Sequence, residues 1–245
     1  MRSHDTDRTP SGAAIDVRGL GLKGPRGWVF REIAFRAEPG ALLAVTGASG
    51  SGRTCLLLAL CGRMRTHEGS ARVAGLRLPG RLGAVRRLAA LAHVPGVSEL
   101  DPALTVAEHL RERALLDRGF APLPRQRAAR RARARAALAA AGLDPGALPK
   151  GPRTAVRDLE RVDALRLAVA LALFGRPRLL AVDDLDLKLS DDERAEAWGL
   201  LRGLAASGPT VLAVCGEAPA YAQVIRTDAT GDEVNDRAVP ATRGA

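Results

Sequence analysis

The residues best suited to chemistry form the run GASGSGRT at residues 47–54. Glycines let successive backbone amides turn toward one phosphate group, and a helix that begins behind the run adds a favourable dipole. Thr54 closes the run, where a hydroxyl can ligate Mg²⁺, and Arg53 stands where the usual spacing has lysine. The alternative is a glycine-rich turn without a ligand, which the strand and helix expected on either side disfavour. The predicted phosphate-binding residues are Gly47, Ser49, Gly50, Ser51, Gly52, Arg53, Thr54 and Cys55.

A second candidate pair, Asp183 and Asp184, ends the apolar run LLAV at residues 179–182. A buried strand here would deliver the Asp183 carboxylate to Mg²⁺ beside the phosphate loop. Asp184, one residue further on, would orient the water that attacks a γ-phosphate. Thr54 and Asp183 are therefore the predicted metal ligands, and Asp184 is the predicted catalytic residue.

The elements that must position these residues follow an α/β pattern, because short apolar runs alternate with helical stretches. The run 41–46 is continuously apolar, which is typical of a strand buried on both faces. Residues 28–30 and 33–35 indicate two short strands of an antiparallel region. Further strands are expected at 15–17, 71–73, 91–94, 179–183 and 211–214, and helices at 54–63, 105–142 with an interruption at 119–124, and 160–174.

The composition supports a folded core, since 47% of the 245 residues are hydrophobic. Aromatic residues make up only 3%, so the core is expected to be aliphatic. No apolar run approaches the roughly 20 residues that span a bilayer, and the polar N-terminus lacks the apolar centre of a secretion signal. We therefore expect a soluble protein made in the cytoplasm. Cys55, Cys61 and Cys215 lack metal-like spacing, which excludes a disulfide scaffold or zinc site.

The chain is basic, with 37 Lys and Arg against 27 Asp and Glu and a net charge of +10. The densest basic stretch, residues 125–135, has no interleaved aromatics and leads into alanine-rich sequence. A solvated helix face is the favoured interpretation, and a patch for nucleic acid or anionic lipid is the alternative.

Several landmarks in this order resemble the nucleotide-binding domain of ATP-binding cassette (ABC) transporters, from about residue 14 to 227. The resemblance implies a P-loop NTPase of the ABC-cassette type, with a mixed sheet core, an antiparallel β edge and a helical subdomain at about 97–176. Polar tails would occupy 1–13 and 228–245. The landmarks are the opening strands at 15–20 and 35–40, the loop 47–54, the segment 94–110, the signature segment 157–177, the strand 179–184 and the strand 210–214.

The sequence departs from the family pattern at most catalytic positions. Arg53 replaces the lysine of the phosphate loop, and Asp184 replaces the catalytic glutamate. Glu160 stands at the position of the family's signature serine, and its carboxylate would repel a phosphate. Acidic residues are, however, also ordinary at the start of a helix. Gly96 replaces the family's glutamine, and Arg161 and Val162 replace two signature glycines. Ser190 replaces an aspartate, and Gly216 replaces the switch histidine.

The resemblance implies an ATP-binding subunit that uses ATP and Mg²⁺, lies on the inner face of the cell membrane, and works with a permease in a separate chain and a second cassette. A degenerate cassette with a nucleotide-binding or regulatory role and little ATPase activity is the alternative. A cassette acting on nucleic acid is the third, less favoured because only one phosphate loop is present. Trp28 lies near the position where the family stacks an aromatic ring on adenine, with simple packing as the alternative.

Overall fold

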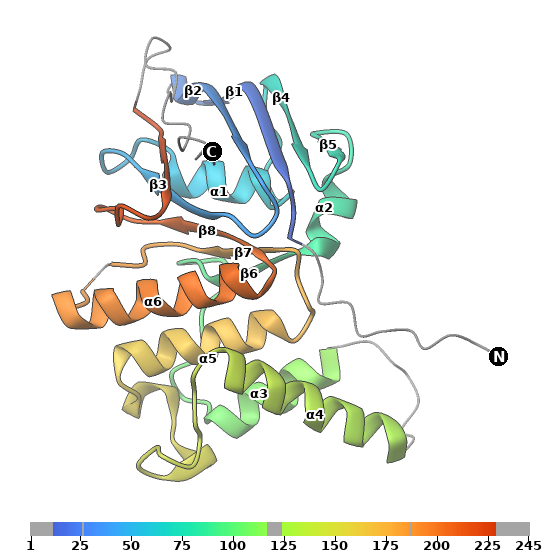
Figure 1. Ribbon diagram of the computed structural model, residues 1–245, viewed down its shortest axis with the longest axis vertical. Coiled ribbons are helices and arrows are strands. Elements are labelled where there is room, and N and C mark those ends of the chain that lie inside the picture. Colours follow the sequence, from blue (N-terminus) through green and yellow to red (C-terminus); the bar gives the residue numbers. More distant parts are fainter. Residues whose placement is uncertain (1–11, 26, 117–123, 187, 229–245) are drawn as a thin grey trace, which may run out of the picture.

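The structure is a computed structural model that describes residues 12–25, 27–116, 124–186 and 188–228 (Figure 1). The expected polar tails and the expected interruption after residue 118 fall almost wholly outside these residues. Ala13, which the sequence analysis places in the N-terminal tail, is fully buried, and its amide donates to the carbonyl of Arg178 at 3.0 Å. The packed part of the chain therefore includes residue 13.

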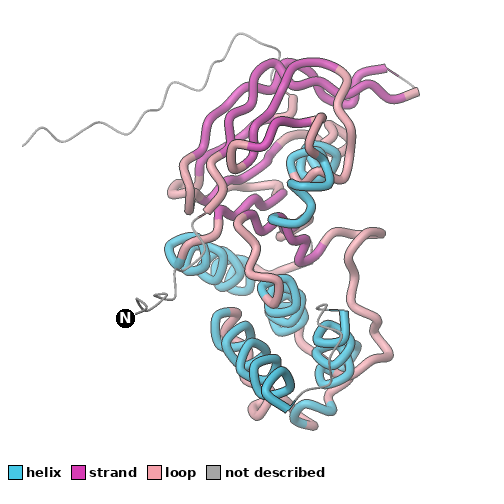
Figure 2. The backbone as a smooth tube through the Cα atoms, turned by 90° about the vertical axis from the view of Figure 1, so that its right-hand side faces the viewer, coloured by secondary structure: helices cyan, strands magenta, loops and turns pink. Residues whose placement is uncertain are grey.

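Two sheets form the upper part of the molecule, and most of the helices lie below them (Figures 1 and 2). The antiparallel sheet has the order β2-β1-β4-β5, and the parallel sheet has the order β6-β7-β8-β3-β9. The mixed α/β architecture expected from the alternating pattern is thus present. The strands are β1 (Ile15–Gly24), β2 (Gly27–Ala37), β3 (Leu42–Thr46), β4 (Glu68–Val73), β5 (Leu76–Leu78), β6 (Ala89–His93), β7 (Leu179–Val182), β8 (Thr210–Val214) and β9 (Gln223–Arg226).

The prediction of two separate strands at 28–30 and 33–35 is wrong, because both belong to β2, which pairs antiparallel with β1. Phe30 pairs with Leu22 and Ile33 pairs with Leu20, with a register shift between the two pairs. Glu32 lies between them with φ +58°, a bulge-like conformation that keeps both Phe30 and Ile33 in the core. Strands β5 and β9 were not expected from the sequence.

The helices divide between the two faces of the parallel sheet. Helix α1 lies among the strands, between the parallel and antiparallel sheets, whereas α5 and α6 cover the opposite face of the parallel sheet (Figure 1). The helices are α1 (Arg53–Leu60), α2 (Leu82–Leu88), α3 (Val106–Leu116), α4 (Pro124–Ala140), α5 (Arg161–Leu173) and α6 (Asp191–Ser207), with short 3₁₀ helices at Gly151–Arg153 and Val156–Asp158.

The position of strand β3 between two packed layers explains why its sequence is continuously apolar. Side chains alternate along a strand, so Leu43 and Val45 face α1 and the antiparallel sheet, whereas Leu42 and Ala44 face α5 and α6. A sheet covered on both faces requires apolar residues at every position. The strand is therefore fixed on both sides, and it delivers the loop that follows it to a defined place.

Helix α5 confirms the expectation of a buried helix, because its sequence is apolar nearly all round. It packs on β6, α4, α3 and α6. Its buried residues include Leu167, Val169 and Ala170, each 0% exposed. Over the described part of the chain, no helix combines the length and the apolar character needed to cross a membrane.

Candidate functional site

The loop between β3 and α1 lies close against its neighbours. Gly52 precedes α1 with φ +84°, and a Cβ there would come within 2.7 Å of both the carbonyl oxygen and a methyl carbon of Val29 on β2. A side chain at this position is therefore excluded. At the neighbouring residue, the hydroxyls of Ser51 and Thr227 are 2.5 Å apart, which ties the loop to the segment directly after β9.

The predicted metal ligands meet directly. The Thr54 hydroxyl donates to the Asp183 carboxylate at 2.6 Å. Both residues lie at the carboxyl edge of the parallel sheet, because Asp183 follows β7 and Thr54 belongs to the helix that follows β3. Strand β8 lies between those two strands, so residues 129 positions apart reach the same crevice.

Asp183 is only 1% exposed, and this burial raises the pKa of its carboxyl above the ordinary value, with the Thr54 hydrogen bond acting in the opposite direction. A buried carboxylate beside a hydroxyl is a suitable pair of hard oxygen ligands for Mg²⁺. Within the described residues, no group of three or more His, Cys, Asp and Glu could hold a metal without further ligands. The pair therefore fits a magnesium ion that takes its remaining ligands from phosphate and water.

Arg53 does not point freely into the loop. Its guanidinium Nη1 donates to the carbonyl oxygen of Cys215 at 3.0 Å, directly after β8. Strands β3 and β8 are parallel neighbours, with Val45 opposite Val214, so the two segments emerge from the sheet side by side. The arginine thus links the phosphate loop to the segment that contains Gly216.

Asp184 extends from the end of β7 in an unusual backbone conformation, with φ +47°. Aspartate tolerates the left-handed region better than most residues because its short side chain bonds locally. The local bond observed here is made by the backbone of Asp184, whose amide donates to the Asp183 carboxylate at 3.0 Å. Asp184 is half-buried.

The loop around Gly96 closes on itself. Gly96 has φ +71°, and the amides of Val97 and Ser98 both donate to the carbonyl of Val94. The Ser98 hydroxyl donates to the Leu91 carbonyl at 3.3 Å, and the Glu99 carboxylate accepts from the Gly96 amide at 3.0 Å. Both side chains are therefore engaged, that of Ser98 with strand β6 and that of Glu99 within the loop.

The start of α5 carries the altered signature. Glu160 precedes the helix, is exposed, and caps no helical amide with its side chain. Arg161 donates to the carbonyl of Lys188, and Val162 is buried in the core. Arg166 joins Asp163 to Glu196 of α6, which fixes the helix start against its neighbour. The Glu160 carboxylate is thus free to repel an anion that approaches this end of the helix.

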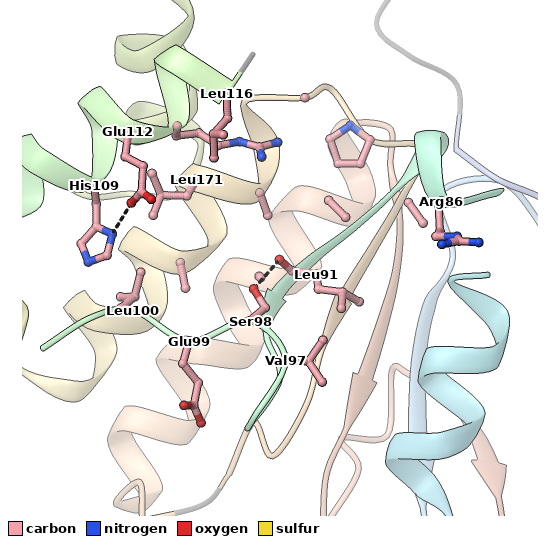
Figure 3. A pocket seen from close by; sticks show the side chains of 18 of the residues that line it. Arg86, Leu91, Val97, Ser98, Glu99, Leu100, His109, Glu112, Leu116 and Leu171 are labelled. Atoms are coloured by element: carbon pink, nitrogen blue, oxygen red, sulfur yellow. Dashed lines mark hydrogen bonds and ion pairs between the residues drawn. The ribbon is translucent and has the colours of Figure 1, made fainter. Parts of the chain in front are cut away.

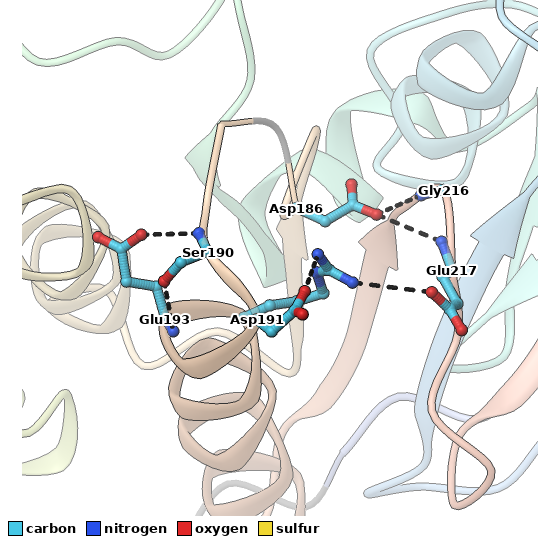
Figure 4. A network of polar contacts seen from close by, with 7 residues as sticks. Asp186, Ser190, Asp191, Glu193, Gly216 and Glu217 are labelled. Atoms are coloured by element: carbon cyan, nitrogen blue, oxygen red, sulfur yellow. Dashed lines mark hydrogen bonds and ion pairs between the residues drawn. The ribbon is translucent and has the colours of Figure 1, made fainter.

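Asp186 is a residue that the sequence analysis missed. Its carboxylate accepts hydrogen bonds from the amides of Gly216 at 2.7 Å and Glu217 at 3.2 Å (Figure 4). Arg194 of α6 lies 3.7 Å from the Glu217 carboxylate and 2.8 Å from that of Asp191. The only hint in the sequence is a third carboxylate two residues after Asp184.

Trp28 on β2 is 38% exposed. Lys23 and Arg31 lie over its ring, at 4.4 and 5.0 Å from the centroid, which makes two cation–π contacts. Val29, the next residue, is the one that contacts Gly52 of the phosphate loop. The ring is thus held in the first hairpin beside the site, with part of its surface open to solvent.

Cys55 lies in the first turn of α1, but the pKa of its thiol is raised and not lowered. Burial raises the pKa of Cys55, and the negative charge of Asp183 raises it further. Burial also raises the pKa of Cys61 and of Cys215 to about 12. Packing in the core is therefore the role of these thiols.

Comparisons with known proteins agree with this geometry. The family model described as ABC transporter matches residues 30–185. The cytochrome c biogenesis ATP-binding export protein CcmA of Cupriavidus necator is 34% identical over 233 residues, which cover 94% of this chain and 96% of the relative. An ABC transporter ATP-binding protein of Streptomyces coelicolor is 32% identical over 206 residues, and the match covers 83% of this chain but only 33% of that relative.

Solved structures show the same fold at lower identity. A subunit of the cbiONQ ABC transporter complex from Clostridium perfringens has a TM-score of 0.71 at 18% identity, covering 86% of this chain and 85% of that one. A bacterial ABC transporter cassette solved as a dimer has a TM-score of 0.67 at 19% identity, covering 87% and 94%. The phosphate loop and the buried Asp183 both lie within the region that the family model matches. The chain therefore belongs to the ABC transporter family, and its P-loop NTPase fold is that of the family's nucleotide-binding domain.

Proposed function

We propose that this chain is the ATP-binding subunit of an ABC transporter, peripheral to the inner face of the cell membrane and coupled to a permease in a separate chain. The observation that carries the proposal is the hydrogen bond between Thr54 and the buried Asp183. It brings a hydroxyl and a buried carboxylate together beside the phosphate loop, and this pair would bind Mg²⁺. The amides of residues 49–54 would hold the phosphates, with Trp28 beside the site as the aromatic surface for adenine.

A groove beside the Gly96 loop supports the permease as the partner. It has a volume of about 620 Å³ and lies between β6, the loop after it, α3 and α5 (Figure 3). In the family that the chain belongs to, this surface contacts the permease. A second cassette, identical or different, completes the assembly under this proposal.

Isothermal titration with Mg-ATP tests the nucleotide part of the proposal. Binding at or below millimolar ATP supports it, provided that Mg²⁺ strengthens ATP binding less in Asp183→Asn than in the wild type. Absence of binding at millimolar ATP contradicts it. Recovery of a multi-span membrane protein in detergent pull-downs tests the permease part, and repeated failure to recover one contradicts it.

The second candidate function is a nucleotide-binding or regulatory module with little or no ATPase activity. Two observations favour it. Glu160 presents a carboxylate at the start of α5, where the family binds the partner's phosphate. Gly216 offers no side chain, and its amide is held by Asp186. Measuring the ATP turnover rate of a chain whose ATP-binding site is intact separates the transporter subunit from the nucleotide-binding or regulatory module.

A further inference from the structure

Helix α4 carries the densest basic stretch of the chain. The sequence from 118 to 143 contains seven arginines and no aspartate or glutamate. The helix packs mainly on α5 and α3, in the lower part of the molecule in Figure 1. One side of it is buried through Ala137 and Leu138, whereas Arg131 and Arg135 are exposed. The charges that its exposed side presents are therefore all positive.

Two of these arginines are available to an anion. Arg131 and Arg135 are four positions apart, so they lie one turn apart on the same side of α4. Among the residues that the structure describes, no carboxylate lies within ion-pair distance of either one. Like charges at this spacing destabilise a helix slightly, and an anion bound between them would remove that cost.

The arginines also stand at the unfavourable end of the helix. All six arginines of α4 fall within its first twelve residues, with no acidic residue in the first turn and no basic residue in the last. The start of a helix carries a partial positive charge, so cations are favoured at the opposite end. A face that meets only solvent leaves both costs uncompensated, whereas an anionic surface against the first half of α4 offsets them.

A stripe of small apolar residues accompanies the arginines. Ala128, Ala132 and Ala136 are exposed and repeat every four residues along α4. This spacing places them on one side of the helix, beside Arg131 and Arg135. Small side chains allow a helix to lie close to a flat surface, while the long arginine side chains reach the charges of that surface.

The helix next to α4 exposes a large apolar side chain. Leu115 of α3 is 71% exposed, more than any other large hydrophobic residue that the structure describes, and it does not line the groove beside the Gly96 loop. A leucine beside arginines suits an anionic lipid surface, which accepts apolar side chains between its headgroups. Single-stranded nucleic acid suits it less, because its bases stack on aromatic rings, and neither α3 nor α4 contains Phe, Tyr or Trp.

We propose that α4, together with the Leu115 end of α3, binds the anionic headgroups of a phospholipid surface. Arg131 and Arg135 pair with lipid phosphates, and Leu115 inserts between the headgroups. The inference goes beyond the proposed function, because this contact needs neither a permease nor a nucleotide. It gives the chain a second attachment to the membrane, one that persists when the permease is absent.

The experiment measures sedimentation of the purified full chain with lipid vesicles in the absence of nucleotide. The vesicles are phosphatidylcholine alone or a two-to-one mixture of phosphatidylcholine and anionic phosphatidylglycerol. Arg131→Gln/Arg135→Gln removes two charges from α4. Arg72→Gln/Arg77→Gln is the matched control, because it removes the same charge from an exposed pair that faces across β4 and β5. Circular dichroism checks that each variant is folded.

The expected result is binding to the anionic vesicles and not to phosphatidylcholine alone. Arg131→Gln/Arg135→Gln weakens this binding by about 10- to 30-fold, since each arginine near an anionic surface contributes about fivefold. The β-sheet control leaves the affinity nearly unchanged. Leu115→Ser weakens binding by a smaller factor than the loss of the two arginines. At about 1 M salt, where screening acts over roughly 3 Å, binding to the anionic vesicles is lost.

Equal binding to the two kinds of vesicle, binding to neither, or equal losses in the two double variants overturns the inference. A fluorescent DNA duplex serves as a competitor. A duplex that binds more tightly than the anionic vesicles, through the same two arginines, also overturns the lipid assignment and favours nucleic acid.

The lipid contact and the proposed function fail separately. ATP binding is measured without vesicles, and recovery of a permease is measured in detergent, so a negative vesicle result leaves the proposed function standing. Conversely, a chain that binds anionic vesicles through α4 but binds no ATP, or recovers no membrane protein, keeps the lipid contact and rejects the transporter subunit.

Discussion

The carboxylate of Asp186 holds the amide of Gly216, at the position where the family has its switch histidine. The same oxygen accepts from the Glu217 amide, so one acidic side chain fixes two consecutive peptide groups. Arg53 holds the preceding carbonyl, that of Cys215. The segment after β8 is thus restrained by two side chains of this chain, Asp186 (Figure 4) and Arg53, without any side chain at position 216.

Replacement of Asp186 by alanine should loosen this segment. Hydrogen bonds to a charged group are worth about 1.5–3 kcal/mol when they are protected from water. Because Asp186 is only half-buried, we expect the smaller end of that range, or about a tenfold faster hydrogen exchange at residues 216 and 217. Exchange measured by mass spectrometry tests this. Asp191→Ala, which removes only a contact to Arg194, should leave the exchange rate unchanged.

Restoring the histidine alone should conflict with Asp186. A Cβ on Gly216 would lie 3.1 Å from the Asp186 carboxylate oxygen, so in Gly216→His that oxygen must shift by a few tenths of an ångström. We expect Gly216→His to lower the melting temperature, and Asp186→Ser/Gly216→His to lose less than the sum of the two single variants. Contacting residues typically couple by about 0.5–3 kcal/mol. Strict additivity in the double-mutant cycle would show that the two positions do not interact.

The phosphate loop and the strand before Asp183 could be predicted from the sequence because each is encoded locally. Residues 47–54 carry their own glycines and hydroxyl, and residues 179–182 carry a continuous apolar run. The pairing of Thr54 with Asp183 then follows from sheet geometry, since parallel strands end at one edge. Burial of α5 followed in the same way from its apolar composition.

The contacts of Asp186 and Arg53 could not be predicted in this way. Each joins segments that are 30 or 162 residues apart, and neither partner atom belongs to a side chain. Backbone amides and carbonyls leave no trace in the sequence, so a pattern of residue types does not show where such a bond forms. The bulge at Glu32 was missed for a related reason, because its left-handed conformation occurs without glycine.

Asp183→Asn should stabilise the protein in the absence of Mg²⁺ and nucleotide at neutral pH. Burial raises the pKa of Asp183, so the folded state binds its proton more readily than the unfolded state does. The charged carboxylate therefore costs stability above the folded pKa, and this cost disappears as the pH falls through that pKa to about 3.8. Asparagine accepts from the Asp184 amide through its Oδ1 and donates its Nδ2–H to the Thr54 oxygen, which turns from donor to acceptor, so both contacts are kept without the charge.

Thermal unfolding of Asp183→Asn and wild type across pH tests this reasoning. The variant's advantage should shrink as the pH is lowered, and about 1 kcal/mol corresponds to roughly 2–4 °C for a chain of this size. Asp16→Asn is the control for which we expect the opposite change in melting temperature at neutral pH, because hydrogen bonding from Arg18 lowers the pKa of Asp16. A lower melting temperature for Asp183→Asn at neutral pH would contradict the account.

Arg53 should contribute to ATP binding through its charge. Arg53→Ala removes that charge and should weaken Mg-ATP binding by about 10- to 100-fold, the value of one or two charge-assisted hydrogen bonds. Arg53→Lys keeps the charge but not the planar fork that reaches Cys215, so its affinity should fall much less. Isothermal titration measures both, with Arg77→Ala on β5 as a control remote from the loop. Equal losses of ATP affinity in Arg53→Ala and Arg53→Lys would show that the planar guanidinium, and not the charge, is responsible.

The last prediction concerns hydrolysis, and it follows from Glu160, Gly96 and Gly216. Removal of a single donor to a transition state typically costs about 2.7–4 kcal/mol, or a hundredfold to a thousandfold in rate. These residues act as one unit, so their losses do not multiply, but any one of them leaves turnover slow. The purified chain alone should therefore hydrolyse ATP poorly or not at all. A mixed dimer with a cassette that has an intact signature could still turn over ATP at the Asp184 site.

Stepwise repair of the site tests this expectation. Gly216→His should leave the rate low, because Glu160 and Gly96 are still defective and Asp186 opposes the new side chain. The rate should rise when Gly216→His is combined with five further substitutions. Glu160→Ser, Arg161→Gly and Val162→Gly restore the signature. Gly96→Gln restores the glutamine, and Asp186→Ser frees the switch position. Asp183→Asn in the repaired chain is the control, since it removes the magnesium ligand and should abolish the gain. Wild-type turnover of several ATP per second would show that Asp184 and the present loops suffice for catalysis, and would reject the argument from the missing residues.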